Sequence, residues 1–344
     1  MKNMSWLSPA YYKEFHCKAD KCRNSCCSNW RIPVSKAEYY RLITIECSED
    51  LNRRIQNTFI MPETVTDSCY RYISFNWQGI CPLQEKRLCN LHREKGEKYL
   101  PEVCRLYPRS LKQINDIGIA SCSSSCERVV EMLLEADSLK IGEAAISEEA
   151  KIFYVIEEED IRRMMVFDDI LKRNDEDLCD KIAKICRIIN KDEFEKDYEA
   201  AEDPLIVTVN LLSRFMDSNA ILDEVISTAI SRYKDDVKQF KIDSEAFEEN
   251  YPDWMPFFER VINNSLIYEC FPFVDKKADQ TKVYKGLCAA YGLLRLVCIA
   301  GTVEDRSKER LVDVVASLFH LIDHTSFYYN ISCIIDNTAV MLKL

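Results

Sequence analysis

Cysteines are concentrated in the first 126 residues of this chain, in groups whose spacing could hold a metal. The first group, C-x4-C-x3-C-C, runs from Cys17 to the adjacent pair Cys26 and Cys27. Thiolates are strong, soft ligands for zinc and for iron–sulfur clusters, which usually take four each. With the C-x7-C-x14-C and C-x3-C groups that follow, the candidate metal ligands are Cys17, Cys22, Cys26, Cys27, Cys81, Cys89, Cys104, Cys122 and Cys126.

Disulfides and an ordinary cysteine-rich core compete with metal binding as explanations. The chain has 17 cysteines, an odd number, and its first residues lack the uninterrupted apolar core of a secretory signal. We therefore expect a cytoplasmic protein, in which thiols stay reduced and clustered cysteines more often bind metal. Six other cysteines occur in apolar helical patterns, where we expect them to be small buried hydrophobic residues: Cys179, Cys186, Cys270, Cys288, Cys298 and Cys333.

The identity of the metal stays open on ligand chemistry alone. Cys26 and Cys27 are awkward for one small zinc site, because neighbouring side chains diverge. An iron–sulfur cluster is larger and tolerates this spacing better, or the two thiolates could serve different sites. His320 and His324 form H-x3-H, which places both rings on one face of a helix. No glutamate motif accompanies them, so we expect a helix with two histidines and no metal.

Charge divides the chain into a basic and an acidic part. Residues 1–128 carry a net charge of +6 and residues 129–344 carry −17, within a total of −11. A basic segment can bind nucleic acid, but lysines and arginines that offset metal-bound thiolates are the simpler explanation. Hydrophobic residues make up 47% of the chain, and no apolar run approaches the roughly 20 residues of a membrane span. We expect neither nucleic acid nor a membrane as a partner.

Glycine usage excludes several common enzyme classes. The seven glycines form neither G-x-G-x-x-G nor G-x-x-x-x-G-K. These motifs carry the close backbone approach to phosphates in dinucleotide-binding folds and in P-loop proteins. The sequence therefore disfavours kinases, dehydrogenases and Rossmann-type methyltransferases.

The helices and strands predicted along the chain, which must position the thiols, are those of a mainly α protein. Residues 1–136 are predicted to form a cysteine-rich, metal-binding α+β module with a short hairpin. Residues 150–344 are predicted to form an all-helical domain, because apolar residues recur there at spacings of three and four. The predicted helices span 159–173, 176–190, 204–217, 219–240, 254–270, 281–300 and 308–323.

Within the module, local signals predict individual elements. A capping box at Ser35, S-x-x-E, opens a helix that we expect to reach about residue 60. Aromatic and β-branched residues over 68–77 predict a strand. Residues 110–121 are predicted to form a hairpin about an Asn-Asp pair. A second capping box, at Ser124, is predicted to start a helix to about residue 135.

These cysteine groups and their flanking residues resemble the flagellin lysine N-methylase family, which carries a cysteine-cluster domain of the C-x-x-C-x-x-x-C-C type. The gap of four residues between Cys17 and Cys22 is longer than in the broad domain. The matching pieces are Phe15-His16-Cys17, Cys22, Cys26–Val34, Cys81-Pro82-Leu83, Leu88–Leu91, Cys104–Arg109, Ser121-Cys122, Cys126-Glu127, Phe271-Pro272-Phe273 and Asp323-His324.

The resemblance implies methyl transfer from S-adenosylmethionine to surface lysines of flagellin. It also implies an iron–sulfur cluster, of the 4Fe–4S type, bound by the cysteine module. Lysine has a pKa near 10.4, so such a site must favour the neutral amine. On motif grounds Tyr107 is the candidate catalytic residue, and Arg105 and Arg109 are candidates for binding the cofactor carboxylate.

Two functions therefore follow from the sequence. The first is a metal-dependent protein-lysine N-methyltransferase, with the acidic helical half recruiting a lysine-rich substrate. The second is a non-enzymatic zinc- or iron–sulfur-binding protein, in which the metal staples a helical interaction domain. Metal analysis and a methylation assay would separate the two.

Overall fold

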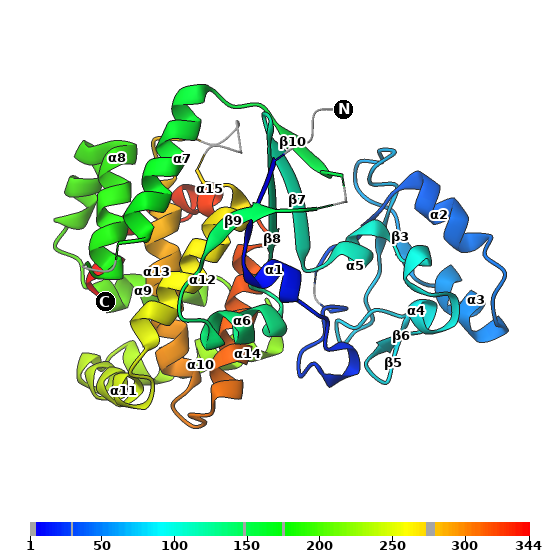
Figure 1. Ribbon diagram of the computed structural model, residues 1–344. Helices are drawn as coiled ribbons and strands as arrows, with labels where there is room; N and C mark the ends of the chain where they lie inside the picture. Colours follow the sequence, from blue (N-terminus) through cyan, green and yellow to red (C-terminus); the bar gives the residue numbers. More distant parts are fainter. Residues whose placement is uncertain (1–4, 29, 147–148, 174–175, 273–278) are drawn as a thin grey trace. The chain divides into compact units, whose positions relative to one another are not determined.

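A computed structural model of the chain separates into two compact units (Figure 1). Unit 2 spans residues 16–108, and unit 1 combines the chain up to residue 15 with residues 109–344. The domain boundary predicted at residue 136 differs from this division, because the hairpin and the helix after it belong to unit 1. The structure describes residues 5–28, 30–146, 149–173, 176–272 and 279–344.

A five-stranded mixed sheet lies within unit 1, in the order β10-β7-β8-β1-β9. β7 (Arg109–Ile114) and β8 (Ile117–Cys122) pair antiparallel and form the predicted hairpin. Asn115 makes the turn with a φ of 50°, which asparagine tolerates better than most residues. The other strands are β1 (Ser5–Pro9), parallel to β8; β9 (Ile141–Ala144), antiparallel to β1; and β10 (Ile152–Tyr154), parallel to β7.

The helices of unit 1 confirm a mainly α chain. Their positions follow the apolar periodicity, with three corrections. The helix predicted over 219–240 is two helices, since Asp236 caps a new one. The helix predicted over 176–190 continues to Tyr198, and the domain predicted to be all-helical also contains β10, which forms by pairing with β7. The helices are α1 (Tyr11–Glu14), α6 (Glu127–Glu135), α7 (Glu158–Leu171), α8 (Leu178–Tyr198), α9 (Pro204–Ser213), α10 (Ala220–Tyr233), α11 (Val237–Asn250), α12 (Trp254–Glu269), α13 (Tyr284–Gly301), α14 (Lys308–Ile322) and α15 (Phe327–Asn330).

The core of unit 1 is built around α13. By length and composition this helix could cross a membrane, but all 18 of its residues are buried within the protein. It packs against α8, α9, α10 and α14, and against the short C-terminal turn at Ala339–Lys343. A predominantly apolar helix that is buried on every side is expected at the centre of such a helical assembly.

Unit 2 is smaller and consists of short elements. A three-stranded antiparallel sheet has the order β2-β4-β3, and β5 and β6 form a hairpin. The strands are β2 (Pro33–Val34), β3 (Phe59–Ile60), β4 (Arg71–Ile73), β5 (Gln84–Glu85) and β6 (Leu88–Cys89), and the helices are α2 (Lys36–Ile43), α3 (Glu49–Gln56), α4 (Asn90–Lys95) and α5 (Glu102–Leu106).

The two predicted capping boxes have different outcomes. Ser35 is the N-cap of α2 and forms the full box with Glu38, as predicted. The long helix expected after it is wrong, because α2 ends at Ile43 and Ser48 caps the separate helix α3. The box at Ser124 is also wrong: α6 begins after Cys126, and the Ser124 hydroxyl accepts a hydrogen bond from another helix.

Candidate metal centre

Four of the nine predicted ligands gather in unit 2. Cys81 is part of the buried core, and Cys27, Cys89 and Cys104 pack against that core. In each of the six possible pairs, the charge of one thiolate would raise the pKa of the other. We call these four cysteines the four-thiol group. They come from three separate stretches of chain, so tertiary folding is what brings them together.

Burial sets the charge state of this group. Loss of water raises the pKa of Cys81 to about 12, and it also raises the pKa of Cys89 and Cys104. Backbone amides oppose this effect: that of Leu83 hydrogen-bonds the Cys81 sulfur and that of His92 the Cys89 sulfur. Amides directed at sulfur stabilise thiolates, and a bound cation would deprotonate such thiols.

The adjacent pair Cys26 and Cys27 is divided between surface and core. Cys26 is exposed, whereas Cys27 packs against the core of unit 2. A hydrogen bond with the Cys26 side chain lowers the pKa of Cys27, against the effect of burial. The Cys26 carbonyl accepts from the Trp30 indole at 2.8 Å, which fixes the turn. One member of the pair therefore joins the four-thiol group.

The four-thiol group fits a soft metal by its chemistry. Four thiols are the usual ligand number for zinc or for an iron–sulfur cluster. Across the described parts of both units, no group of three or more His, Cys, Asp or Glu side chains is already arranged as a metal site. The types of donor atom in the four-thiol group fit zinc and iron–sulfur equally.

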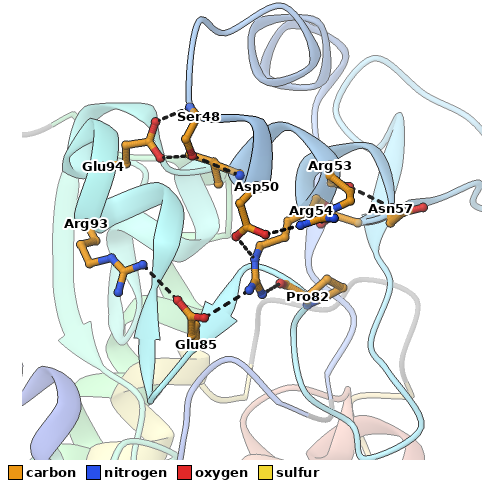
Figure 2. A network of polar contacts seen from close by, with 11 residues as sticks. Ser48, Asp50, Arg53, Arg54, Asn57, Pro82, Glu85, Arg93 and Glu94 are labelled. Carbon is orange, nitrogen blue, oxygen red and sulfur yellow. Dashed lines mark hydrogen bonds and ion pairs between the residues drawn. The ribbon is translucent and has the colours of Figure 1, made fainter.

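Charged side chains hold the loop that begins at Cys81 (Figure 2). The Arg54 guanidinium of α3 donates to the Pro82 carbonyl oxygen at 3.2 Å and pairs with Glu85 at 3.3 Å. Asp50, one turn earlier, accepts from Arg54 at 2.7 Å and orients it. This arrangement ties the residue after Cys81 to a helix of unit 2.

The same loop is also fastened to α4, the helix that follows it (Figure 2). Arg93 of α4 pairs with Glu85 at 3.1 Å, soon after Cys89. The next residue, Glu94, accepts hydrogen bonds from the amide and the hydroxyl of Ser48, both at 2.7 Å. The segment between two thiols of the group is thus held at Pro82 by a hydrogen bond and at Glu85 by ion pairs to α3 and α4.

The remaining predicted ligands lie elsewhere. Cys17, Cys22 and Cys26 are exposed or half-buried in unit 2. Cys122 ends β8 and Cys126 precedes α6, both in unit 1, and a thiolate at Cys126 would raise the pKa of Cys122. The structure therefore brings together four of the nine in one unit and two more in the other.

The predicted catalytic and cofactor-binding residues fall on both sides of the unit boundary. Tyr107 ends the helix of Cys104, and its ring packs against Trp30 with centroids 5.8 Å apart. Arg105 lies beside Cys104 and is 3.7 Å from the Glu102 carboxylate.

Arg109 begins β7 in unit 1. Its guanidinium donates to the Phe15 carbonyl oxygen at 3.0 Å and stacks 4.9 Å from the Phe15 ring centroid. It also lies close enough to Cys122 to lower the pKa of that thiol, although burial raises the pKa more strongly. Arg109 therefore neighbours the unit 1 thiols.

Unit 1 contains a buried polar network that the cysteine pattern did not indicate. It surrounds residues 122–126, Cys-Ser-Ser-Ser-Cys, which we call the serine turn. Burial raises the pKa of Asp323 to about 6, and lowers that of His324 to about 3 with help from the nearby His320. The His320 and His324 rings lie 5.1 Å apart. The sequence signal was an aspartate directly after the apolar helix α14, together with three consecutive serines.

The remaining sequence predictions concern the scattered cysteines and the motif residues. Of the six scattered cysteines, four are buried as expected, whereas Cys179 is half-buried and Cys333 is exposed. Two residues of the family-like motifs, Asn29 and Phe273, lie outside the part of the chain that the structure describes.

The chain is similar in sequence to proteins named for lysine methylation and for flagellar biosynthesis. The chain is 28% identical over 150 residues to a protein of Salmonella typhimurium named Lysine-N-methylase, and 27% identical over 149 residues to one of that name from Salmonella choleraesuis. These matches cover 42% of this chain and 37% of each relative, so they span little more than a third of those proteins. The Flagellar biosynthetic protein FliU of Salmonella muenchen is 28% identical over 147 residues, 85% of its length. Neither a family model nor a solved structure matches.

Proposed function

We propose that this protein is a cytoplasmic, iron–sulfur-dependent protein-lysine N-methyltransferase that uses S-adenosylmethionine and acts on flagellin. The similarity to two proteins named Lysine-N-methylase carries the proposal of lysine methylation. The relative named for flagellar biosynthesis supports a flagellar substrate.

The gathering of four thiols in unit 2 supports the metal requirement. Without a cation, burial keeps Cys81, Cys89 and Cys104 protonated. Metal loading would release protons and bind these thiolates together with Cys27. If one iron of an iron–sulfur cluster lacked a thiolate ligand, that open position could instead coordinate the amino and carboxylate groups of S-adenosylmethionine.

Methyl transfer to lysine needs a neutral amine. The amine nitrogen forms a bond to the methyl carbon as the carbon–sulfur bond of the sulfonium breaks, and one proton must leave the nitrogen for each methyl added. Tyr107, ionised to its phenolate, is our candidate to accept that proton, since it directly follows the short helix that carries Cys104. Arg105 and Arg109 stay candidates for the cofactor carboxylate.

The test of the enzyme is mass spectrometry of flagellin after incubation with anaerobically purified protein and S-adenosylmethionine. Methylated lysines that depend on all three components are expected. Full metal loading with unmodified flagellin would refute the proposed substrate. If no other lysine-rich protein were methylated either, the metal-binding adaptor function would replace the enzyme.

The metal requirement has its own prediction. Replacing Cys81 by serine should lower the iron and sulfide bound per chain by more than half, since three thiolates hold a four-ligand cluster poorly. Cys47→Ser is the matched control, because Cys47 lies in unit 2 outside the four-thiol group. Equal iron content in both variants would contradict the assignment, and zinc in place of iron would correct the metal.

A further inference from the structure

The carboxylate of Asp323 is buried in unit 1 at the C-terminal end of α14, with 5% of the residue exposed. One oxygen, Oδ2, accepts hydrogen bonds from the Ser123 hydroxyl at 2.7 Å and from the Ser124 amide at 2.9 Å. The other, Oδ1, accepts from the Ser265 hydroxyl of α12 at 2.8 Å. Both oxygens are therefore bound, and two of the three bonds go to the serine turn.

Other buried side chains hold the same turn. The Asn264 amide donates to the Cys122 carbonyl oxygen at 3.0 Å and to the Ser124 hydroxyl at 2.8 Å. The Tyr11 hydroxyl, from α1, donates to the side-chain oxygen Oδ1 of Asn264 and lies 3.4 Å from the backbone nitrogen and oxygen of Cys122. Helices α1, α12 and α14 thus converge on a turn of five residues.

A histidine binds the third serine of the turn. The Ser125 hydroxyl lies 2.8 Å from Nε2 of His324 and 2.7 Å from the Ser123 hydroxyl. Hydrogen bonds therefore run without a break from Asp323 through two serines to His324. Each serine of the turn has a side-chain partner from α12 or from the end of α14.

Stability alone does not account for this arrangement. Removing a carboxylate from water costs several kcal/mol, and an apolar core of the same volume is often more stable. Buried polar networks that are fully hydrogen-bonded instead fix one conformation. The feature fixed here is a turn with a thiol at each end, one closing a strand and one preceding a helix.

We propose that Asp323 is a positioning residue that fixes the serine turn and thereby holds in place the thiols of Cys122 and Cys126, two of the nine candidate ligands. Asp323 contacts neither thiol itself; it acts through Ser123 and Ser124. The purpose of this positioning rests on the proposed metal-dependent function, but the positioning itself can be measured without metal.

The experiment measures thiol protection in the metal-free full-length chain. Iodoacetamide is added anaerobically, and alkylation of Cys122, Cys126 and the core residue Cys298 is followed over time by mass spectrometry. In Asp323→Asn we expect alkylation of Cys122 and Cys126 to be about tenfold faster than in the wild type, because the turn opens more often. The rate at Cys298 should not change.

A matched control separates the turn from burial in general. Asp197 is another buried carboxylate of unit 1, but it accepts from the amide of Ala339. Asp197→Asn should leave alkylation of Cys122 and Cys126 at the wild-type rate. Ser265→Ala keeps the Asp323 carboxylate and removes one of its hydrogen-bond donors, so alkylation of both thiols should be about threefold faster than in the wild type. This variant provides the test if Asp323→Asn does not fold.

Two results would overturn the proposal. One is alkylation of the two thiols at wild-type rates in both Asp323→Asn and Ser265→Ala. The other is an equal acceleration at Cys298 in Ser265→Ala, which would show a role in the whole fold. A failure of the proposed function gives a different result. The wild-type protein would then lack iron or leave flagellin unmethylated, while Cys122 and Cys126 would still be protected from alkylation.

Discussion

At the scale of single residues, loss of water is the main influence on the pKa values of the buried carboxylates of unit 1. Asp197 shows this plainly, because its carboxylate is buried and accepts a hydrogen bond from the Ala339 amide at 3.1 Å. The hydrogen bond favours the charged form, yet burial raises the pKa of Asp197 to about 6. The folded protein therefore holds this proton more tightly than the unfolded chain does.

This shift predicts a pH dependence of stability. Between pH 4 and 6 the folded state binds more protons at Asp197 than the unfolded state, so the free energy of unfolding falls as pH rises. Asp197→Asn removes this contribution. The free energy of unfolding at pH 4 minus that at pH 7 should therefore be smaller in the variant than in the wild type by about 1–2 kcal/mol, allowing for partial screening by water. Denaturant titrations at both pH values measure it, and an unchanged difference would contradict the assignment.

At the scale of elements, the position of a thiol depends on what its own loop is tied to. The loop from Cys81 to Cys89 is fastened to α3 by Arg54 and to α4 by Arg93, with Glu85 between them (Figure 2). Exposed ion pairs add little stability individually. Partners that orient metal ligands have larger effects on metal affinity than on folding.

Removing the Arg54 guanidinium should therefore weaken metal retention. We expect Arg54→Ala to lose iron to a chelator about tenfold faster than the wild type, with little change in melting temperature. Arg53→Ala is the matched control, because Arg53 is the neighbouring arginine and its exposed side chain also pairs with Asp50. Equal rates of iron loss in both variants would remove the positioning role of Arg54.

Close packing of α13 allows a second prediction at this scale. A Cβ atom at Gly286 would lie 2.4 Å from the backbone oxygen of Tyr328, which cannot move without shifting α15. Gly286→Ala should therefore lower the free energy of unfolding by about 3 kcal/mol or more. At Gly142, in β9, a Cβ atom would meet nothing within 4 Å, so Gly142→Ala should be nearly neutral. Similar melting temperatures for the two variants would contradict this packing.

At the scale of the whole molecule, the two units depend on different sources of stability. Unit 1 has a helical core in which an entire helix, α13, is buried. Unit 2 spans residues 16–108, and its core includes one thiol of the four-thiol group, with the other three packed against it. Small domains with limited cores commonly rely on metal for part of their stability.

Metal removal should therefore act on one unit. After chelation under reducing conditions, we expect hydrogen exchange of the α4 amides in unit 2 to accelerate by a factor corresponding to about 2 kcal/mol or more. Exchange in α13 should not change, which provides the internal control. If both units were to lose protection together, or neither did, the four-thiol group would not be the metal site of unit 2.

The sequence by itself determined the features that depend on neighbouring residues. The capping box at Ser35, the hairpin about Asn115 and the helical periodicity of unit 1 all follow from interactions within a few positions of the chain. Cysteine spacing likewise predicted candidate metal ligands. The short strands β1, β9 and β10 were missed, because three to five residues acquire strand structure only by pairing with distant partners.

Tertiary structure alone decided which of the candidate ligands lie near one another. Cys27, Cys81, Cys89 and Cys104 lie up to 77 positions apart, and burial in one core selects them from nine similar thiols. The hydrogen bonds of Asp323 could not be predicted from the sequence either. Their donors are hydroxyls and an amide that lie in the turn after β8 and on α12, far away in the chain. Burial and long-range hydrogen bonds depend on the positions of distant segments, and a local pattern of residue types does not contain them.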